Sequence, residues 1–174
     1  MKTIEDHMSF YEAYHKHPLN KLTHFVGIPA IIFSILIPMS WLGVSFGGNT
    51  ITLAIVFVFV VLGYYFRLDM VFGLAMAAFI VPLLALAHHV AQNWTLGNGA
   101  LLFLAAFAGG WILQLAGHVV FEKRRPALAD NLFQLVIGPI FLCAELFFLL
   151  GFKREMHQKV VELSKAYALE QPTH

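Results

Sequence analysis

The sequence predicts an all-α fold, a polytopic integral membrane bundle with four transmembrane helices, a broken or re-entrant fifth apolar segment and amphipathic terminal helices. Hydrophobic residues make up 59% of the 174 residues and charged residues only 12%, whereas a soluble domain carries about 25% charged residues. Long uncharged stretches of this kind are typical of membrane spans. The net charge of +1 gives no indication of nucleic-acid binding. The single cysteine, Cys143, excludes a disulfide framework within the chain and a cysteine-based metal site.

The N-terminal part, residues 1–19, is predicted to be a short helix at the membrane interface. Its apolar side chains fall near one face of a helix over residues 4–16, at Ile4, Met8, Tyr11 and Tyr14 or His15. Pro18 ends this helix, because the residue before a proline is pushed out of the helical region, and Asn20 suits the N-cap of the next helix. Because it has acids and no continuous apolar region, the N-terminus does not match a cleaved signal peptide.

Five apolar segments are predicted within residues 20–152, before a cytoplasmic helix or tail at 153–174, in a single membrane domain. They cover residues 25–42, 51–66, 70–90, 99–121 and 132–152. The last segment holds Gly138-Pro139 near its middle, and proline removes a backbone donor and clashes with the preceding turn. A broken helix is tolerated at membrane depth when it packs against protein or a wet cavity. We therefore expect this segment not to span.

The positions of the lysines and arginines predict that both termini are cytoplasmic. With four spans the basic residues fall on one side, whereas the connections at 43–50 and 93–99 contain none. The expected location is the inner membrane of a bacterium or the endoplasmic reticulum membrane of a eukaryote. The basic residues are Lys2, Lys16, Lys21, Arg67, Lys123, Arg124 and Arg125, followed in the tail by Lys153, Arg154, Lys159 and Lys165.

Polar residues within the fourth apolar segment lie on one stripe. Gln114, His118 and Glu122 are spaced four residues apart, so they follow one another along a helix with a drift of about 40° per step. Ionisable groups within apolar helices are functional by default. Gln114 and Glu122 flank His118, so we predict that they fix the orientation of its imidazole and are the candidate catalytic residues.

Helix geometry explains why a proline between His15 and His24 would be needed for a shared metal site. On a continuous helix, nine residues would place the two imidazoles about 180° apart, so that they could not bind one ion. A turn at Pro18 lets the chain fold back, and both rings can then face the same way. With His118, at the same side of the membrane, three neutral imidazoles could hold one metal and leave positions open for a substrate.

Other polar residues have plainer interpretations. His17 directly precedes Pro18 and fits a local turn residue. His88 and His89 fall on the opposite side of the membrane in this topology, unless the third helix ends early. Glu145 fits a helix-packing residue, although Gly138-Pro139 nearby is also consistent with a site.

Two stretches of the chain resemble a known family. The patterns YHKHPLNKLTHFVGIP and GHVVFEKRRPALADNLFQL, followed by GPIFLCAELFFLLGF, are similar to the 2-hydroxy fatty acid dioxygenase family of fungal phytosphingosine breakdown. The similarity covers about residues 10–152, and GHxxFEKRRPAL is its specific string. The resemblance implies a small membrane enzyme that uses ferrous iron and O₂ to shorten a 2-hydroxy fatty acid by one carbon. The ligands that it implies are His15, His24 and His118.

The resemblance also implies how the substrate binds. A 2-hydroxy acid can chelate iron through its carboxylate and hydroxyl, which leaves a position for O₂. Imidazole suits iron and zinc alike, so the choice of Fe²⁺ comes from the resemblance. The acyl chain would lie among the apolar helices and membrane lipids, with its carboxylate at the interface. The substrate-binding candidates there are Asn20, Lys123, Arg124 and Arg125.

Two interpretations from other classes stay open. One is a non-enzymatic membrane scaffold or lipid-binding protein, in which the histidines make local caps. The other is a bis-histidine haem protein, although the sequence offers no evident pair on facing helices at the same depth. Purified protein without stoichiometric metal would favour the scaffold, and a Soret absorption band would favour haem.

Overall fold

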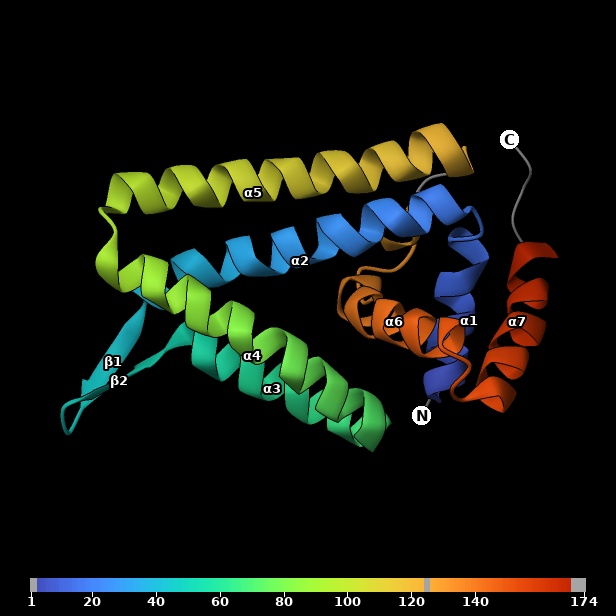
Figure 1. Ribbon diagram of the computed structural model, residues 1–174, viewed down its shortest axis with the longest axis horizontal. Coiled ribbons are helices and arrows are strands. Elements are labelled where there is room, and N and C mark those ends of the chain that lie inside the picture. The colour runs from blue at the N-terminus through green and yellow to red at the C-terminus, as the bar shows by residue number, and fades with distance from the viewer. Residues whose placement is uncertain (1–2, 124–125, 170–174) are drawn as a thin grey trace. The chain divides into compact units, whose positions relative to one another are not determined.

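The structure is a computed structural model that describes residues 3–123 and 126–169 (Figure 1). Most of this part is helical, which confirms the predicted helical class. The helices are α1 (Ile4–Tyr14), α2 (Pro18–Trp41), α3 (Leu53–Leu68), α4 (Met70–Asn93), α5 (Leu96–Ala116), α6 (Gln134–Leu149) and α7 (Arg154–Leu169), with the π-helix η1 (Gly117–Glu122) and the 3₁₀ turn η2 (Ala127–Ala129). Two strands, β1 (Gly43–Phe46) and β2 (Asn49–Thr52), complete the set. Lys2, Arg124 and Arg125 lie outside the described residues.

The chain forms two compact units. We call Met1–Phe25 with Gln114–His174 the terminal unit, and Val26–Leu113 the central unit. The boundaries between the units fall inside α2 and α5. Each predicted site residue within the described ranges belongs to the terminal unit.

Three of the described helical stretches are long and apolar enough to cross a membrane, namely Pro18–Trp41, Met70–Asn93 and Leu96–Glu122. α3 has 16 residues, which is about 24 Å at 1.5 Å per residue and less than the hydrocarbon core of about 30 Å. The membrane bundle is therefore supported for three spans. The fourth span stays a prediction.

The fifth apolar segment forms one continuous helix, α6, so the predicted break at Gly138-Pro139 is wrong. Pro139 removes only the N–H that would bond to the Leu135 carbonyl. The other backbone groups keep their helical partners, because apolar surroundings offer them no alternative, and the helix runs on to Leu149. With 16 residues, α6 is shorter than a typical span, and its re-entrant or interfacial placement stays a prediction.

In the central unit, α2 and α5 pack closely and antiparallel (Figure 1). An added Cβ on Gly110 would stand 2.7 Å from Ile31 Cγ1 and 2.9 Å from the Gly27 carbonyl oxygen. At the other end of the pair, a Cβ on Gly99 would stand 3.1 Å from the Trp41 ring. Small residues are what allow membrane helices to approach so closely.

The connection between α2 and α3 is a β-hairpin, an element that the all-α prediction lacked. β1 and β2 pair antiparallel, with Phe46 opposite Asn49. Gly47 and Gly48 between them have φ values of 58° and 84°. A two-residue type I′ turn needs positive φ at both positions, and glycine adopts it without strain. Gly47 and Gly48 thus allow the tight turn that pairs β1 with β2. The sequence alone predicted only a loop at this position.

In the terminal unit, α1 packs against α7 and α6. Its buried side includes Ile4, Met8, Tyr11 and Tyr14, which confirms the predicted face. Thr3 and Asp6 form a reciprocal capping box at its start, at 2.8 and 3.2 Å. An ion pair between Glu5 and Lys159, at 3.3 Å, links α1 to α7.

Residues 15–17, which we call the elbow, connect α1 to α2. α1 ends at Tyr14, and Pro18 starts α2 at the first helical position, where its missing N–H costs nothing. The prediction that Pro18 ends the first helix is therefore corrected. The predicted N-cap at Asn20 is also wrong, because Asn20 lies inside the first turn of α2. His17 caps this turn instead, since its Nδ1 accepts the Leu19 N–H at 3.2 Å.

Candidate metal centre

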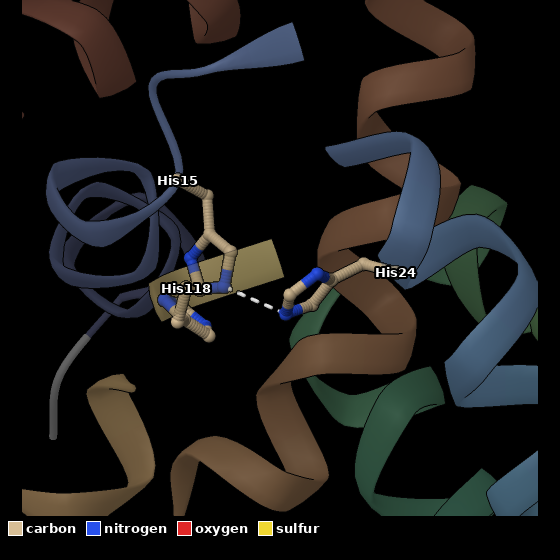
Figure 2. Close-up of side chains that lie close together, drawn as sticks. All are labelled: His15, His24 and His118. Atoms are coloured by element: carbon tan, nitrogen blue, oxygen red, sulfur yellow. Dashed lines mark hydrogen bonds between the residues drawn. The ribbon is translucent and has the colours of Figure 1, made fainter. Parts of the chain in front are cut away.

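Three histidines converge in the terminal unit from three different segments (Figure 2). His15 opens the elbow directly after α1, His24 lies about two turns into α2, and His118 lies on η1. The elbow brings the two N-terminal rings to the same place, as the spacing around Pro18 predicts. Their ring centroids are 4.5 Å apart, and those of His15 and His118 are 4.7 Å apart.

The cluster is closed to solvent and compact. The exposed fractions of His15, His24 and His118 are 2%, 3% and 2%. Their candidate ligand nitrogens all lie within 4.8 Å of one another. Burial, with His24 and His118 close by, lowers the pKa of His15 well below its usual range. The His15 ring is therefore neutral at pH 7, which is the form that binds a metal.

Backbone contacts fix the tautomers of two of the rings. His15 Nδ1 lies 2.8 Å from the Tyr11 carbonyl oxygen, and His24 Nδ1 lies 2.9 Å from the Asn20 carbonyl oxygen. A carbonyl oxygen only accepts hydrogen bonds, so both Nδ1 atoms carry the proton. Both Nε2 atoms then present lone pairs, and these two atoms face each other at 3.1 Å.

Two lone pairs at this distance repel each other unless a cation lies between them. Two nitrogens that are each about 2.1 Å from one ion stand about 3.0 to 3.4 Å apart for angles between 90° and 109°, so 3.1 Å fits a shared metal. The third ring, that of His118, has a buried Nδ1 without a hydrogen-bond partner among the described residues. A buried polar atom usually has a partner. The donor set therefore fits a metal ion.

Glu122 holds the elbow against η1, and Gly117 brings η1 close to α2. Glu122 Oε1 accepts the His17 backbone N–H at 2.7 Å and the Asn20 Nδ2–H at 3.0 Å. Gly117 lies so close to α2 that an added Cβ would stand 2.3 Å from both Asn20 Oδ1 and Thr23 Oγ1. Because His118 is also on η1, these contacts set its distance from the other two rings. π-helical turns of this type are frequent at functional sites.

Aromatic rings support the centre from the side of α1 and α6. The Tyr11 ring stacks on His15 at 3.8 Å between centroids, with an interplanar angle of 3°. Phe141 of α6 packs against Tyr11 at 4.5 Å. Tyr14 donates a hydrogen bond to Asp130 Oδ2 at 2.5 Å, which ties the segment after η1 to α1. The His15 ring is thus restrained both by its carbonyl partner and by stacking.

Comparison with known proteins assigns the family. The chain matches the family described as "2-hydroxy-palmitic acid dioxygenase Mpo1-like" over residues 1–150. The chain belongs to the Mpo1-like family. It is 37% identical over 153 residues to the 2-hydroxy-palmitic acid dioxygenase MPO1 of Saccharomyces cerevisiae, an alignment that covers 86% of this chain and 82% of the yeast protein. No solved structure matches.

In this Mpo1-like chain the predicted residues fall into two groups. The predicted ligands come together, whereas the hydrogen bonds of Glu122 go to His17 and Asn20 and not to His118, contrary to the prediction that Glu122 orients this ring. Gln114 lies one turn before His118, and its buried Nε2 has no hydrogen-bond partner within residues 3–123 and 126–169. Asn20 donates to Glu122, while its Oδ1 is likewise without a partner there. Lys123 is exposed at the end of η1, with a φ of 53°.

The other histidines lie elsewhere. His88 and His89 belong to α4 in the central unit. The ring of His17 stacks on Phe121 at 5.3 Å. Among the described residues, the group that could hold a metal ion therefore contains only the three predicted histidines.

Sequence reasoning did not connect Tyr11, Glu12 or Lys21 with the candidate centre. Tyr11 bonds to and stacks on His15, and Glu12 and Lys21 form an ion pair between α1 and α2. A usable signal was their spacing, because Glu12 precedes His15 by three residues and Lys21 precedes His24 by three. Residues three apart are neighbours on a helix surface. Tyr11 precedes His15 by four residues, so its carbonyl and ring both reach the histidine.

Substitution of Glu122 tests what this carboxylate does. Glu122→Ala removes the acceptor of two hydrogen bonds, one from the elbow at His17 and one from α2 at Asn20. We therefore expect metal affinity to fall about 10- to 100-fold, the range for residues that orient ligands. Glu122→Gln keeps the accepting Oε1 and is expected to bind metal as the wild type does. Equilibrium dialysis of the purified variants against Fe²⁺ under argon measures both.

The glutamine variant also separates positioning from acid–base catalysis. If Glu122 moves a proton in turnover, Glu122→Gln will keep its metal and lose activity. If Glu122→Ala binds metal as tightly as the wild type, the elbow does not depend on Glu122.

Proposed function

We propose that this protein is an iron(II)-dependent dioxygenase that shortens 2-hydroxy fatty acids by one carbon. The observation that carries the proposal is the facing pair of unprotonated Nε2 atoms of His15 and His24, 3.1 Å apart, with His118 beside them. Membership of the Mpo1-like family and the yeast relative's name support the reaction class. Three helices long and apolar enough to cross a membrane suit an acyl substrate.

His15, His24 and His118 would hold the iron, and three imidazoles leave positions for other ligands. The chemistry supplied by ferrous iron is electron transfer from a chelated 2-hydroxy acid to O₂, which zinc cannot supply. The overall reaction balances without a further reductant: the acid and O₂ give the fatty acid one carbon shorter, CO₂ and water. The carbonyls of Tyr11 and Asn20 hold the proton on each Nδ1 and so keep both Nε2 lone pairs directed at the site.

The remaining residues would bind the substrate head. Gln114 offers a buried amide donor one turn from His118, which suits an oxygen of the substrate carboxylate. Asn20 Oδ1 is an acceptor that suits the 2-hydroxyl group. Lys123, with Arg124 and Arg125 beside it in sequence, would attract the carboxylate at the interface. Within this proposal the site faces the cytoplasm, at the inner membrane of a bacterium or at the endoplasmic reticulum of a eukaryote.

The geometry of the three-histidine cluster disfavours the haem interpretation. Two imidazoles on opposite sides of a haem iron, each about 2.0 Å away, would have nitrogens about 4 Å apart with the porphyrin between them. The 3.1 Å separation of the two Nε2 atoms leaves no room for that plane. A non-enzymatic scaffold would have no need for three buried imidazoles with facing lone pairs.

Product analysis with ¹⁸O₂ tests the reaction. Protein loaded with Fe²⁺ and given a long-chain 2-hydroxy acid is expected to yield the acid one carbon shorter, with label in its new carboxylate by mass spectrometry. The matched substrate control is the acid without the 2-hydroxyl, which lacks the second chelating oxygen and is expected not to react. Chelators are expected to stop turnover, and Zn²⁺ is expected not to restore it. Unlabelled product, or equal turnover under argon, would exclude a dioxygenase.

A further inference from the structure

A partly buried charge cluster lies beside the metal centre and has no role in the proposed function. The Lys21 ammonium on α2 stands 3.0 Å from Glu12 Oε2 of α1 and 3.0 Å from Glu145 Oε2 of α6. The exposed fractions of the three side chains are 20%, 15% and 10%. One ammonium therefore joins carboxylates from two other helices of the terminal unit.

The Glu12–Lys21 pair joins α1 to α2, close in sequence to the two imidazoles that face each other across the elbow. Glu12 precedes His15 by three residues and Lys21 precedes His24 by three, so each partner of the ion pair lies about one helical turn from one of the imidazoles. Both pairs bridge the elbow. A change in the angle between α1 and α2 would therefore alter the Glu12–Lys21 distance and the distance between the two Nε2 atoms together.

Three contacts join α6 to α1 and α2 near the two imidazoles. Glu145 reaches Lys21, and Phe141, one turn earlier on α6, packs against Tyr11 at 4.5 Å. The Lys21 ammonium also lies 5.7 Å from the centroid of the Phe141 ring. Since Tyr11 stacks on His15, the aromatic contact of α6 reaches the metal centre through Tyr11, while its charged contact reaches α2 at Lys21.

The energetics of such clusters favour a role in geometry over one in overall stability. Removing two charges from water offsets much of their attraction, so a buried ion pair is often no more stabilising than apolar residues of the same volume. The best-attested use of buried polar groups is to fix a register between elements. In a chain with only 12% charged residues, three of them gathered beside three buried histidines fit that use.

We propose that Lys21 is a positioning residue for the metal centre: by binding Glu12 and Glu145 together, it holds α1, α2 and α6 so that His15 and His24 stand at chelating distance. This inference rests on the metal centre of the proposed function, but not on the oxidation of a 2-hydroxy acid. It concerns a residue outside the predicted ligand and substrate sets.

The test measures metal affinity and coordination geometry in the full-length protein. Lys21→Met is expected to weaken Co²⁺ binding about 10- to 100-fold, as loss of an orienting partner typically does, and to change the visible absorption bands of bound Co²⁺. Lys159→Met is the matched control, because Lys159 also pairs with a glutamate of α1, Glu5, but at the face towards α7. It is expected to leave affinity and spectrum unchanged. Lys21→Arg, which keeps the charge, is expected to retain most of the affinity.

A triple variant separates positioning from the cost of leaving two carboxylates unpaired. The variant Glu12→Gln/Lys21→Met/Glu145→Gln contains no unpaired charge at this position. It also lacks the ionic contacts that join α1, α2 and α6. We expect its melting temperature to recover relative to Lys21→Met while its Co²⁺ affinity stays low. If Lys21→Met does not fold, the triple variant carries the same test against the wild type.

The outcomes distinguish this inference from the proposed function. Wild-type Co²⁺ affinity and spectrum in Lys21→Met, or full recovery of affinity in the triple variant, would overturn the positioning role alone. Wild-type protein that binds Fe²⁺ and fails to oxidise a 2-hydroxy acid would overturn the proposed reaction alone. Wild-type protein that binds neither ion would overturn both.

Discussion

Replacing His118 with alanine is expected to abolish metal retention and turnover while the protein still inserts into membranes. The variant loses one of three imidazoles, and the fall in metal affinity should exceed the range of about 10- to 100-fold that applies to residues which only orient ligands. His15→Ala and His24→Ala are expected to behave alike. Because ligands act as a unit, combining these substitutions should add little to the loss. Elemental analysis of anaerobically purified protein gives the metal content directly.

His157→Ala is the control for this series. His157 lies on α7, where its ring stacks on Phe148 with 4.6 Å between centroids, and it is exposed. Its loss is expected to leave metal content and activity unchanged. Equal metal content in the wild type and in His118→Ala would mean that the three buried imidazoles do not form the site.

The apolar elements could be predicted because their signal is local. Five apolar segments separated by turn residues all appear as helices, and the buried side of α1 follows from its spacing of apolar residues. The wrong predictions concern helix ends, where a few hydrogen bonds to the backbone decide which residue caps the helix. At the elbow, the sequence suggested Asn20 as the cap, yet His17 takes this place and frees the Asn20 side chain to reach Glu122.

Pro139 shows a second reason why a prediction from the sequence was wrong. A proline inside a helix costs one hydrogen bond and some bending, and in a soluble protein that cost often ends the helix. In an apolar segment the remaining backbone groups have no water to bond with, so the helix continues. The same holds for Pro29 and Pro38 of α2 and for Pro82 of α4.

The histidine cluster could be predicted because ionisable groups in an apolar chain are few and expensive. His15, His24 and His118 stood out for this reason, and the convergence of His15 and His24 follows from the elbow before Pro18. The pairing of Lys21 with Glu145 could not be found in this way. Glu145 reaches Lys21 from 124 positions further along the chain, a pairing that depends on how α6 packs and that no local pattern encodes.

The glycine at the start of η1 provides the second large expected effect. A Cβ at residue 117 would stand 2.3 Å from Asn20 Oδ1 and from Thr23 Oγ1. In Gly117→Ala, either η1 and α2 move apart or the Asn20 and Thr23 side chains give up their bonds to Glu122 and to the Asn20 carbonyl. Overpacking of this kind costs about 1–3 kcal/mol of stability. His118 is the next residue, so a shift of η1 would carry its imidazole away from His24. We expect metal affinity to fall at least about ten-fold, with a lower melting temperature.

Gly109→Ala is the matched control, because Gly109 lies on α5 with no atom within 4 Å of an added Cβ. The added methyl group is expected to leave metal affinity unchanged, since alanine favours a helix more than glycine does and nothing obstructs it. The comparison isolates contact with α2 from the general effect of a glycine-to-alanine change. If Gly117→Ala loses stability but keeps wild-type metal affinity, the centre tolerates a wider gap between η1 and α2. In that case Glu122 and the elbow, not close packing at Gly117, would set the distance from His118 to the other two rings.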